Sequence, residues 1–161
     1  MSRETKIKHV GVFCGSCSGN VPIYEEAAYE LGKTLALEHI NLIYGGGGIG
    51  LMRTVADAVL QHGGSVTGIL PRFFDSNAVG HKTITEMIIV NSMSERKEKI
   101  IALSDAFIAL PGGYGTLDEL FEVLVYSQLN LHRKAVGILN TNHFYDPLLQ
   151  QLARMQEDGF L

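Results

Sequence analysis

Short apolar runs rich in Val and Ile alternate along the chain with longer segments in which apolar residues recur at helical spacing. This alternation is typical of repeated strand and helix units around a parallel sheet. The apolar runs predict strands at residues 8–14, 41–44, 65–70, 84–90, 105–110 and 135–139. The periodic segments predict helices at 22–38, 51–61, 93–104, 117–131 and 144–157. Most of the strands are apolar almost throughout, as in sheets covered on both faces, so we expect an α/β fold with a doubly wound parallel sheet.

The length and composition predict one domain over residues 1–161. The chain has 161 residues, of which 46% are hydrophobic and 19% charged, and this is enough apolar material for one core. Residues 72–82 have the weakest pattern, and we expect them to form a loop between two strands.

The charge and the cysteines restrict the class of protein. A formal net charge of −4 at pH 7 gives no broad basic field for a nucleic acid or an anionic membrane. The first residues lack the layout of a signal peptide, and no apolar stretch reaches the roughly 18 residues that span a bilayer. Two cysteines, Cys14 and Cys17, are too few for the disulfide framework of a small secreted domain. We therefore expect a cytoplasmic protein with no nucleic-acid or membrane partner.

Three glycine-rich turns follow predicted strands, at residues 14–19, 44–50 and 110–116. In an open parallel sheet, ligands bind at the carboxyl ends of the strands, where these turns lie. Gly112, Gly113 and Gly115 let the backbone aim successive N–H groups at an anion, next to the positive end of the following helix. An ordinary turn would need only one or two glycines, so the third turn predicts a phosphate-binding loop.

The second turn formally matches G-x-G-x-x-G through Gly45, Gly47 and Gly50. It follows the second strand, and the next strand ends without a ribose-binding acid, which disfavours a classical NAD site. None of the turns carries the Gly-Lys-Ser/Thr of a nucleoside triphosphatase. A nucleoside monophosphate is therefore the better candidate ligand.

The segment 92–99 begins a helix, with Ser92 and Glu95 as its capping box. Met93, Ile100 and Ile101 define an inward face on which the cations Arg96 and Lys97 occupy positions where apolar residues are expected. Buried cations are costly unless they meet an anion, so we expect Arg96 to face a ligand. Alternatively, its long side chain could extend outward to solvent.

Thr116-Leu-Asp-Glu119 also reads as a capping box, and this structural interpretation of Glu119 is the favoured one from the residues alone. The chemical interpretation places the Glu119 carboxylate one turn from the phosphate loop, near the sugar of a bound nucleotide. Both interpretations can hold together.

Other chemistries have weaker support. Cys14-x-x-Cys17 could be a redox dithiol, but Pro22 delays the helix whose N-terminus would lower the thiol pKa. The six histidines are scattered without metal-ligand spacing, so we expect no metal site. Ser16 lacks the context of a hydrolase nucleophile.

At residues 111–119 the sequence Pro-Gly-Gly-Tyr-Gly-Thr-Leu-Asp-Glu resembles the PGGxGTxxE signature of the LONELY GUY family of nucleoside 5'-monophosphate phosphoribohydrolases. Segments 13–19, 44–52 and 93–97 extend the resemblance over nearly the whole chain. The resemblance implies a Rossmann-like homodimer that cleaves the N-glycosidic bond of AMP or N6-modified cytokinin nucleotides without a cofactor. Members are often labelled lysine decarboxylases, but a pyridoxal-phosphate enzyme needs an identifiable Schiff-base lysine.

The resemblance also implies roles for individual residues. The catalytic pair falls on Arg96 and Glu119, with Arg96 expected to hold Glu119 ionised. The residues implied to bind phosphate or substrate are Gly112, Gly113, Tyr114, Gly115, Thr116, Lys97, Ser16, Gly46, Gly47 and Met93. The positions that depart from the family pattern are Cys17, Ser94 and Ala78, the last in a loop where a substrate-contacting acid is expected. Family members usually continue past Leu161, which predicts a shortened chain.

One alternative function stays open. Proteins that resemble molybdenum cofactor carriers share the Rossmann-like fold and bind a phosphorylated pterin without cleaving it. Glycine-rich loops do not separate the two functions, whereas an acid at Glu119 paired with a base at Arg96 favours hydrolysis.

Overall fold

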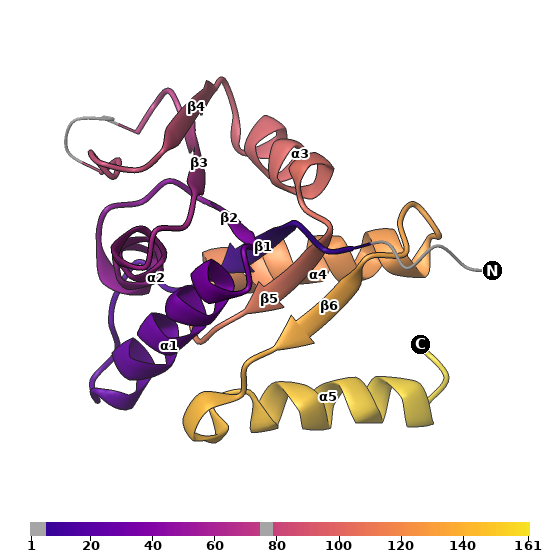
Figure 1. Cartoon of the computed structure of the whole chain (residues 1–161). Coiled ribbons are helices and arrows are strands. Elements are labelled where there is room, and N and C mark those ends of the chain that lie inside the picture. Colours follow the sequence, from indigo (N-terminus) through magenta and orange to yellow (C-terminus); the bar gives the residue numbers. More distant parts are fainter. Residues whose placement is uncertain (1–5, 75–78) are drawn as a thin grey trace.

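The computed structural model describes residues 6–74 and 79–161. Its strands form one six-stranded sheet in the order β4-β3-β2-β1-β5-β6, and every neighbouring pair is parallel (Figure 1). The strands are β1 (His9–Phe13), β2 (Asn41–Tyr44), β3 (Val66–Pro71), β4 (Glu86–Val90), β5 (Ala106–Ala109) and β6 (Ala135–Ile138). The predicted α/β fold is confirmed, and the sheet is doubly wound outward from the neighbours β1 and β5.

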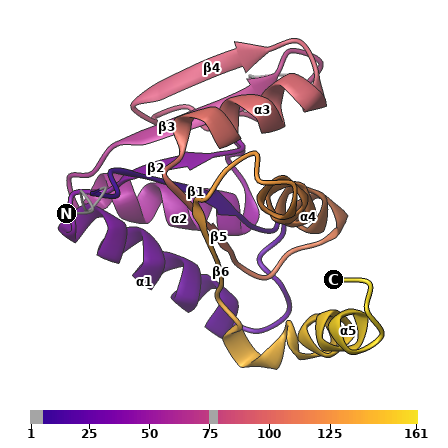
Figure 2. The same cartoon turned by 90° about the vertical axis from the view of Figure 1, so that its right-hand side faces the viewer.

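Helices cover both faces of the sheet. α1 (Ile23–Leu37) and α2 (Gly50–Gln61) pack on one face, and α3 (Met93–Leu103) and α4 (Tyr114–Gln128) pack on the other (Figure 2). A short 3-10 turn, η1 (Thr141–His143), and α5 (Asp146–Glu157) follow the edge strand β6. Side chains of successive strand residues point to opposite faces, and this divides the core into two clusters.

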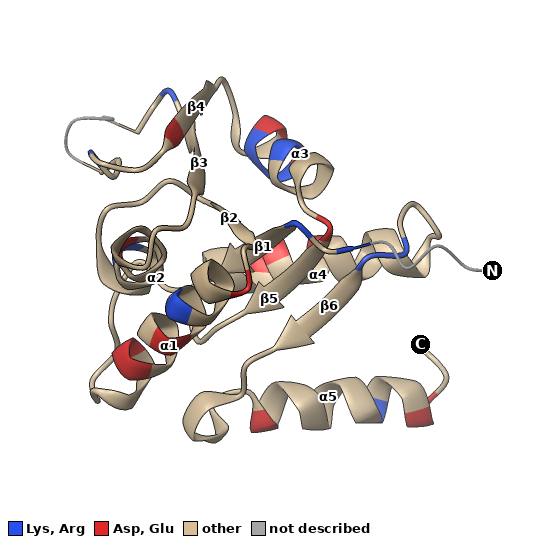
Figure 3. Cartoon of the chain, viewed as in Figure 1, with Lys and Arg blue, Asp and Glu red and all other residues tan. Residues whose placement is uncertain are grey.

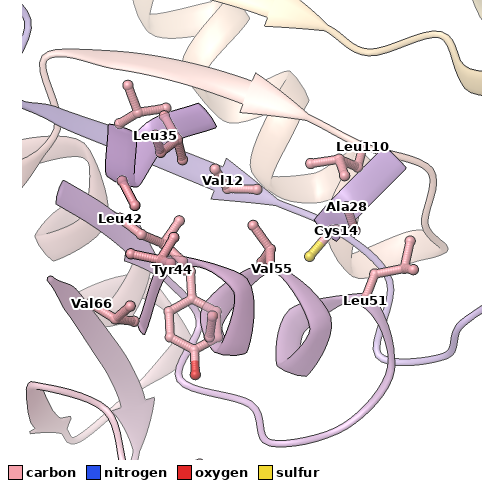
Figure 4. Packing of buried hydrophobic residues seen from close by; sticks show 14 of the residues in the cluster. Val12, Cys14, Ala28, Leu35, Leu42, Tyr44, Leu51, Val55, Val66 and Leu110 are labelled. Carbon is pink, nitrogen blue, oxygen red and sulfur yellow. The ribbon is translucent and has the colours of Figure 1, made fainter. Parts of the chain in front are cut away.

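The larger cluster lies between the sheet and the pair α1 and α2 (Figure 4). These two helices approach each other closely at Gly32, where a Cβ atom would lie 2.5 Å from the Val55 carbonyl oxygen. Tyr44 is fully buried in this cluster, and its hydroxyl donates to the Gly47 carbonyl oxygen at 3.1 Å. The end of β2 is thereby joined to the glycine-rich turn that follows it.

Of the two predicted N-terminal caps, the one of α3 is confirmed and the one of α4 is wrong. Ser92 caps α3 as predicted, because its hydroxyl accepts the Glu95 amide at 3.1 Å. The predicted capping box at Thr116 and Glu119 is wrong, because α4 begins at Tyr114 with Gly113 as its N-cap. Thr116 therefore lies inside the first turn of the helix and does not cap it.

The surface carries both signs of charge. Figure 3 shows Lys and Arg interspersed with Asp and Glu, and α3 carries both kinds. Within the described residues, no helix is both long and apolar enough to span a membrane. Across 6–74 and 79–161, no group of three or more His, Cys, Asp or Glu side chains could hold a metal ion.

Candidate active site

A cavity of about 600 Å³ opens at the carboxyl ends of the central strands. Its walls come from the three glycine-rich turns, the start of α3, the first two turns of α4 and the loop after β3. The Gly15 amide donates to the Pro111 carbonyl oxygen at 3.0 Å and so joins the turns after β1 and β5. The cavity lies between these two strands, at the point where the strand order reverses, which is the usual ligand site of such sheets.

The N-terminus of α4 forms one end of the cavity. Leu117 is the first residue whose amide is bonded back to the Gly113 carbonyl oxygen, at 3.1 Å. The preceding amides in the first turn have no partner within the helix and favour an anion. A Cβ atom built on Gly113 or Gly115 would meet nothing within 4 Å, so the backbone here is open to a ligand.

Arg96 is buried and is fixed by main-chain carbonyl groups. Its Nε donates to the Ile69 carbonyl oxygen at 3.1 Å, and its Nη2 donates to the Gly45 carbonyl oxygen at 3.0 Å. A side chain on Gly45 would collide with this guanidinium group. Nη1 lies 3.7 Å from the Met93 sulfur, a weak acceptor, so its donors are available to a ligand in the cavity. The inward orientation expected from the helical pattern is confirmed.

Glu119 projects from the second turn of α4 into the same cavity. Its Oε1 lies 3.9 Å from Arg96 Nη2, and both side chains are 11% exposed. Burial raises the pKa of Glu119 to about 7, although the nearby charge of Arg96 acts to lower it. The expectation that Arg96 holds Glu119 ionised is therefore met only in part, because loss of solvation outweighs the attraction of the guanidinium group.

Lys97 lies outside this cavity. Its Nζ contacts Asp118 Oδ2 at 3.1 Å and Glu122 Oε1 at 3.4 Å, both on α4. Burial acts to lower the Lys97 pKa, but the hydrogen bond to Asp118 and the charge of Glu122 outweigh it, so the pKa is raised. Lys97 thus connects α3 to α4 and does not line this cavity.

The structure brings most of the predicted site residues together. Those that line the cavity are Ser16, Gly47, Met93, Arg96, Gly113, Tyr114, Gly115, Thr116 and Glu119. The Tyr114 residue is 95% exposed, so its side chain extends toward solvent from the rim of the cavity. Gly46, Gly112 and Lys97 are not among the lining residues. Ala78 lies outside the described residues.

Gly46 and Gly112 do not line the cavity, but they shape the turns that do. Gly46 has φ +77°, a left-handed conformation that favours glycine. A side chain on Gly112 would collide with the Thr116 hydroxyl, so the lack of a Cβ atom at Gly112 lets Thr116 pack against the turn after β5.

Sequence reasoning missed the apolar wall of the cavity. Its apolar lining residues include Ile49, Met52, Leu70, Phe74 and Val79. Met52 and Leu70 read as ordinary core positions in the sequence. Phe74 and Val79 belong to the weakly patterned loop after β3, where spacing carries no signal.

The two cysteines differ in environment. Both are free thiols, Cys14 buried and Cys17 exposed. The Cys14 side chain points into the core beneath α2 (Figure 4). Burial, and then the charge of Glu119, raise the pKa of the Cys14 thiol well above its usual range. A nucleophilic dithiol needs a lowered thiol pKa, so this environment disfavours the redox alternative.

Comparison with known proteins places the geometry in a family. Residues 52–161 match the family model described as possible lysine decarboxylase. A probable cytokinin riboside 5'-monophosphate phosphoribohydrolase of Oryza sativa subsp. japonica is 45% identical over 98% of this chain and 65% of its own length. A cytokinin riboside 5'-monophosphate phosphoribohydrolase of Arabidopsis thaliana is 45% identical over 100% of this chain and 76% of its own length. The chain thus spans between about two thirds and three quarters of these relatives.

Solved structures of similar shape are more distant in sequence. A molybdenum cofactor carrier protein from Chlamydomonas reinhardtii has a TM-score of 0.67 at 24% identity, over 91% of this chain and 85% of that one. A molybdenum cofactor binding protein from Rippkaea orientalis has a TM-score of 0.64 at 24% identity, over 93% and 99%. At this identity the likeness shows the Rossmann-like fold alone. From the family model and the relatives above, the chain belongs to the possible lysine decarboxylase family, together with the cytokinin riboside 5'-monophosphate phosphoribohydrolases.

Proposed function

We propose that this chain hydrolyses the N-glycosidic bond of AMP or of N6-modified cytokinin nucleoside 5'-monophosphates, releasing the free base and ribose 5-phosphate. The names of its relatives support a phosphoribohydrolase. The observation that carries the proposal is the buried pair of Arg96 and Glu119, which shares one cavity with the N-terminus of α4. An anion site and a buried acid one turn apart suit a substrate with a phosphate and a reacting sugar.

In this proposal the phosphate binds the open amides at the start of α4 and the hydroxyl of Thr116, which is 3% exposed. Binding energy from the phosphate then fixes the ribose beside Glu119. The apolar wall of the cavity receives the base. Arg96 offers N–H donors to the substrate between the phosphate end and the base end of the cavity. Its position is set by the carbonyl oxygens of Ile69 and Gly45 and not by the ligand.

The chemical step breaks the C1'–N bond and passes through a transition state with oxocarbenium character at C1'. The Glu119 carboxylate stabilises that positive charge and accepts a proton from the attacking water. The water oxygen bonds to C1', and the departing base nitrogen takes up a proton. With a pKa of about 7, Glu119 is ionised in a substantial fraction of molecules at neutral pH.

A decarboxylase reaction has less support from the residues. Pyridoxal phosphate is held by a Schiff-base lysine. Among the described residues that line the cavity there is no lysine, and Lys97 is committed to Asp118 and Glu122 outside it. The donor set of the cavity therefore does not fit that cofactor.

The proposal is tested by incubating the protein with AMP, N6-isopentenyl-AMP, GMP and CMP and measuring released ribose 5-phosphate. We expect release from the adenine nucleotides, and we expect Glu119→Gln to bind AMP while losing at least about 100-fold in kcat. Asp118→Asn is the matched control, since Asp118 lies on the same helix but points away from the cavity. Full activity in Glu119→Gln would overturn the role of this residue.

The carrier alternative has a distinct outcome in the same experiment. Unchanged AMP after prolonged incubation, together with tight binding of a phosphorylated pterin, would favour a carrier over an enzyme. The structural likeness to carriers does not favour it, because it is a likeness of fold at 24% identity.

The setting of the reaction is part of the proposal. We propose that residues 1–161 act as one domain, as a homodimer, in the cytoplasm and without a metal or organic cofactor. Exposed apolar side chains along and beyond α4 support the dimer, among them Val125, Leu129 and Leu131. The free thiols of Cys14 and Cys17 are compatible with a reducing compartment.

A further inference from the structure

Residues 79–81 form a partition between two cavities. On the inner side Val79 lines the proposed substrate cavity. On the outer side a second cavity of about 300 Å³ is lined by His81 together with Arg53 and Asp57 of α2. The position of this partition therefore determines how much room the apolar end of the catalytic cavity offers.

Main-chain hydrogen bonds attach the partition to the turn after β2. The Gly48 amide donates to the Val79 carbonyl oxygen at 2.8 Å, and the His81 amide donates to the Gly46 carbonyl oxygen at 2.9 Å. These bonds flank an antiparallel bridge between Gly47 and Gly80. Such a two-bond ladder is too short to be stable alone, so side-chain contacts have to contribute.

The His81 ring supplies that contact. It is 7% exposed, and its Nε2 lies 2.9 Å from Asp57 Oδ1. The Thr83 amide, which can only donate, lies 3.3 Å from His81 Nδ1. In the neutral ring Nδ1 is therefore the acceptor, and the proton sits on Nε2, directed at Asp57. One side chain thus binds its own loop through Nδ1 and binds α2 through Nε2.

Asp57 is itself held in place on α2. Its Oδ2 accepts from Arg53 Nε at 3.2 Å, one helical turn away, so each carboxylate oxygen has one partner. Met52 on the same helix lines the catalytic cavity. The contact between His81 and Asp57 consequently fixes the distance between two parts of the apolar wall, Met52 on α2 and Val79 on the partition.

We infer that His81 and Asp57 are positioning residues that set the base end of the substrate cavity. This inference rests on the proposed function, because it assigns the apolar end to the base and the α4 end to the phosphate. The pair touches neither the substrate nor the reacting atoms. Its loss lets the partition move away from α2, which weakens binding of the base but leaves the phosphate loop and Glu119 in place.

The test compares a ligand that has a base with one that lacks it. For His81→Ala and Asp57→Ala we expect KM for AMP to rise about tenfold, the value of one hydrogen bond to a charged group, with kcat within about twofold. Inhibition by ribose 5-phosphate, which has no base, should change by less than about twofold. The double variant should be no worse than either single variant, because both remove the same contact.

Two further variants separate positioning from general damage. His81→Gln keeps an N–H donor toward Asp57 and should recover most of the AMP affinity. His9→Ala is the matched control, because His9 also pairs with an aspartate, Asp105, at 3.5 Å but lies at the amino end of β1. We expect His9→Ala to leave KM unchanged.

The outcomes distinguish this inference from the proposed function. Calorimetry of AMP binding in the Glu119→Gln background reports on the partition whether or not the bond is cleaved. If the unmodified protein releases no ribose 5-phosphate but His81→Ala still weakens AMP binding, the reaction is wrong and the positioning role stands. Unchanged AMP affinity in His81→Ala, or an equal loss for ribose 5-phosphate, would overturn the positioning role. If neither the unmodified protein nor any of the variants binds AMP, both the proposed function and the positioning role are overturned.

Discussion

Arg96 is held in place by contacts that do not involve Glu119, its partner in the cavity. The guanidinium group of Arg96 is held by the carbonyl oxygens of Ile69 and Gly45, at the ends of β3 and β2. Its distance to Glu119, 3.9 Å, is longer than that of a bidentate ion pair. Arg96 therefore lowers the Glu119 pKa only in part, and burial leaves that pKa near 7.

This balance predicts a pH-dependent gain in stability for Glu119→Gln. A carboxyl group whose folded-state pKa is raised keeps its proton to higher pH when folded than when unfolded. As the pH rises from 4.5 to about 7, the wild-type protein therefore loses stability, by roughly 3 kcal/mol for a shift of this size. The amide of Gln escapes this loss, so the variant should be more stable above pH 7, with the gain vanishing toward pH 4.

Urea unfolding at pH 4.5 and pH 8 measures the effect. The difference in unfolding free energy between variant and wild type should be larger at pH 8. Asp118→Asn, with a half-exposed carboxylate on the same helix, is the control. An equal gain for Glu119→Gln at both pH values would show that burial does not raise the Glu119 pKa.

At the scale of elements, the start of α4 departs most from what the sequence pattern predicts. The sequence pattern predicts this helix only from Leu117, and glycines such as Gly113 and Gly115 disfavour helices. The helix nevertheless begins at Tyr114. The preceding residues are fixed by the sheet, since the Leu110 amide donates to the Phe13 carbonyl oxygen at 2.9 Å, and this places the chain at the helix start. Tertiary contacts outweigh local propensity at this point.

Other elements followed the pattern closely, for physical reasons. The six strands are confirmed to within about two residues at each end. The four inner strands, which are largely buried, are apolar over most of their length, as expected for parallel strands covered on both faces. Arg96 could be found because a cation interrupts the inward face of α3. Lys97 could not be separated from it by pattern, since neighbouring helical residues point about 100° apart and only contacts decide which one faces inward.

The open space beside Gly113, in the turn proposed to bind phosphate, predicts how one added methyl group changes ligand affinity and stability. Gly113→Ala should unfold at a nearly unchanged temperature, because its Cβ atom would meet nothing within 4 Å. The added methyl group would instead occupy the concavity for the phosphate, so affinity for ribose 5-phosphate should fall about tenfold or more.

Two other glycine variants serve as comparisons. Gly112→Ala places its Cβ atom against Thr116 and within 2.9 Å of the Gly15 amide nitrogen, so it should lower the unfolding free energy by about 1–3 kcal/mol. Gly137→Ala in β6 lies away from the cavity and should affect neither quantity. Unchanged ribose 5-phosphate binding in Gly113→Ala would mean that the phosphate lies elsewhere.

At the scale of the whole molecule, the last part of the chain supports a site formed by earlier parts. Tyr145, at the start of α5, is 2% exposed, and its hydroxyl donates to the Leu110 carbonyl oxygen at 2.6 Å. Leu110 directly follows β5 and begins the glycine-rich turn that is proposed to bind phosphate. The segment that follows β6 is therefore joined by a buried hydrogen bond to the first residue of this turn.

Tyr145→Phe tests this connection, because it removes the hydroxyl and leaves the Leu110 carbonyl group buried. The unfolding free energy should fall by about 1–3 kcal/mol with an unchanged dependence on urea. Burial, and then the charge of Cys14, raise the pKa of Tyr145 to about 12, so the hydroxyl keeps its proton at physiological pH. The loss should therefore be equal at pH 6 and pH 9, unlike the pH-dependent effect at Glu119. Tyr29→Phe, which retains the contact of its ring with His62, is the control, and an equal loss there would contradict a specific role for the Tyr145 hydroxyl.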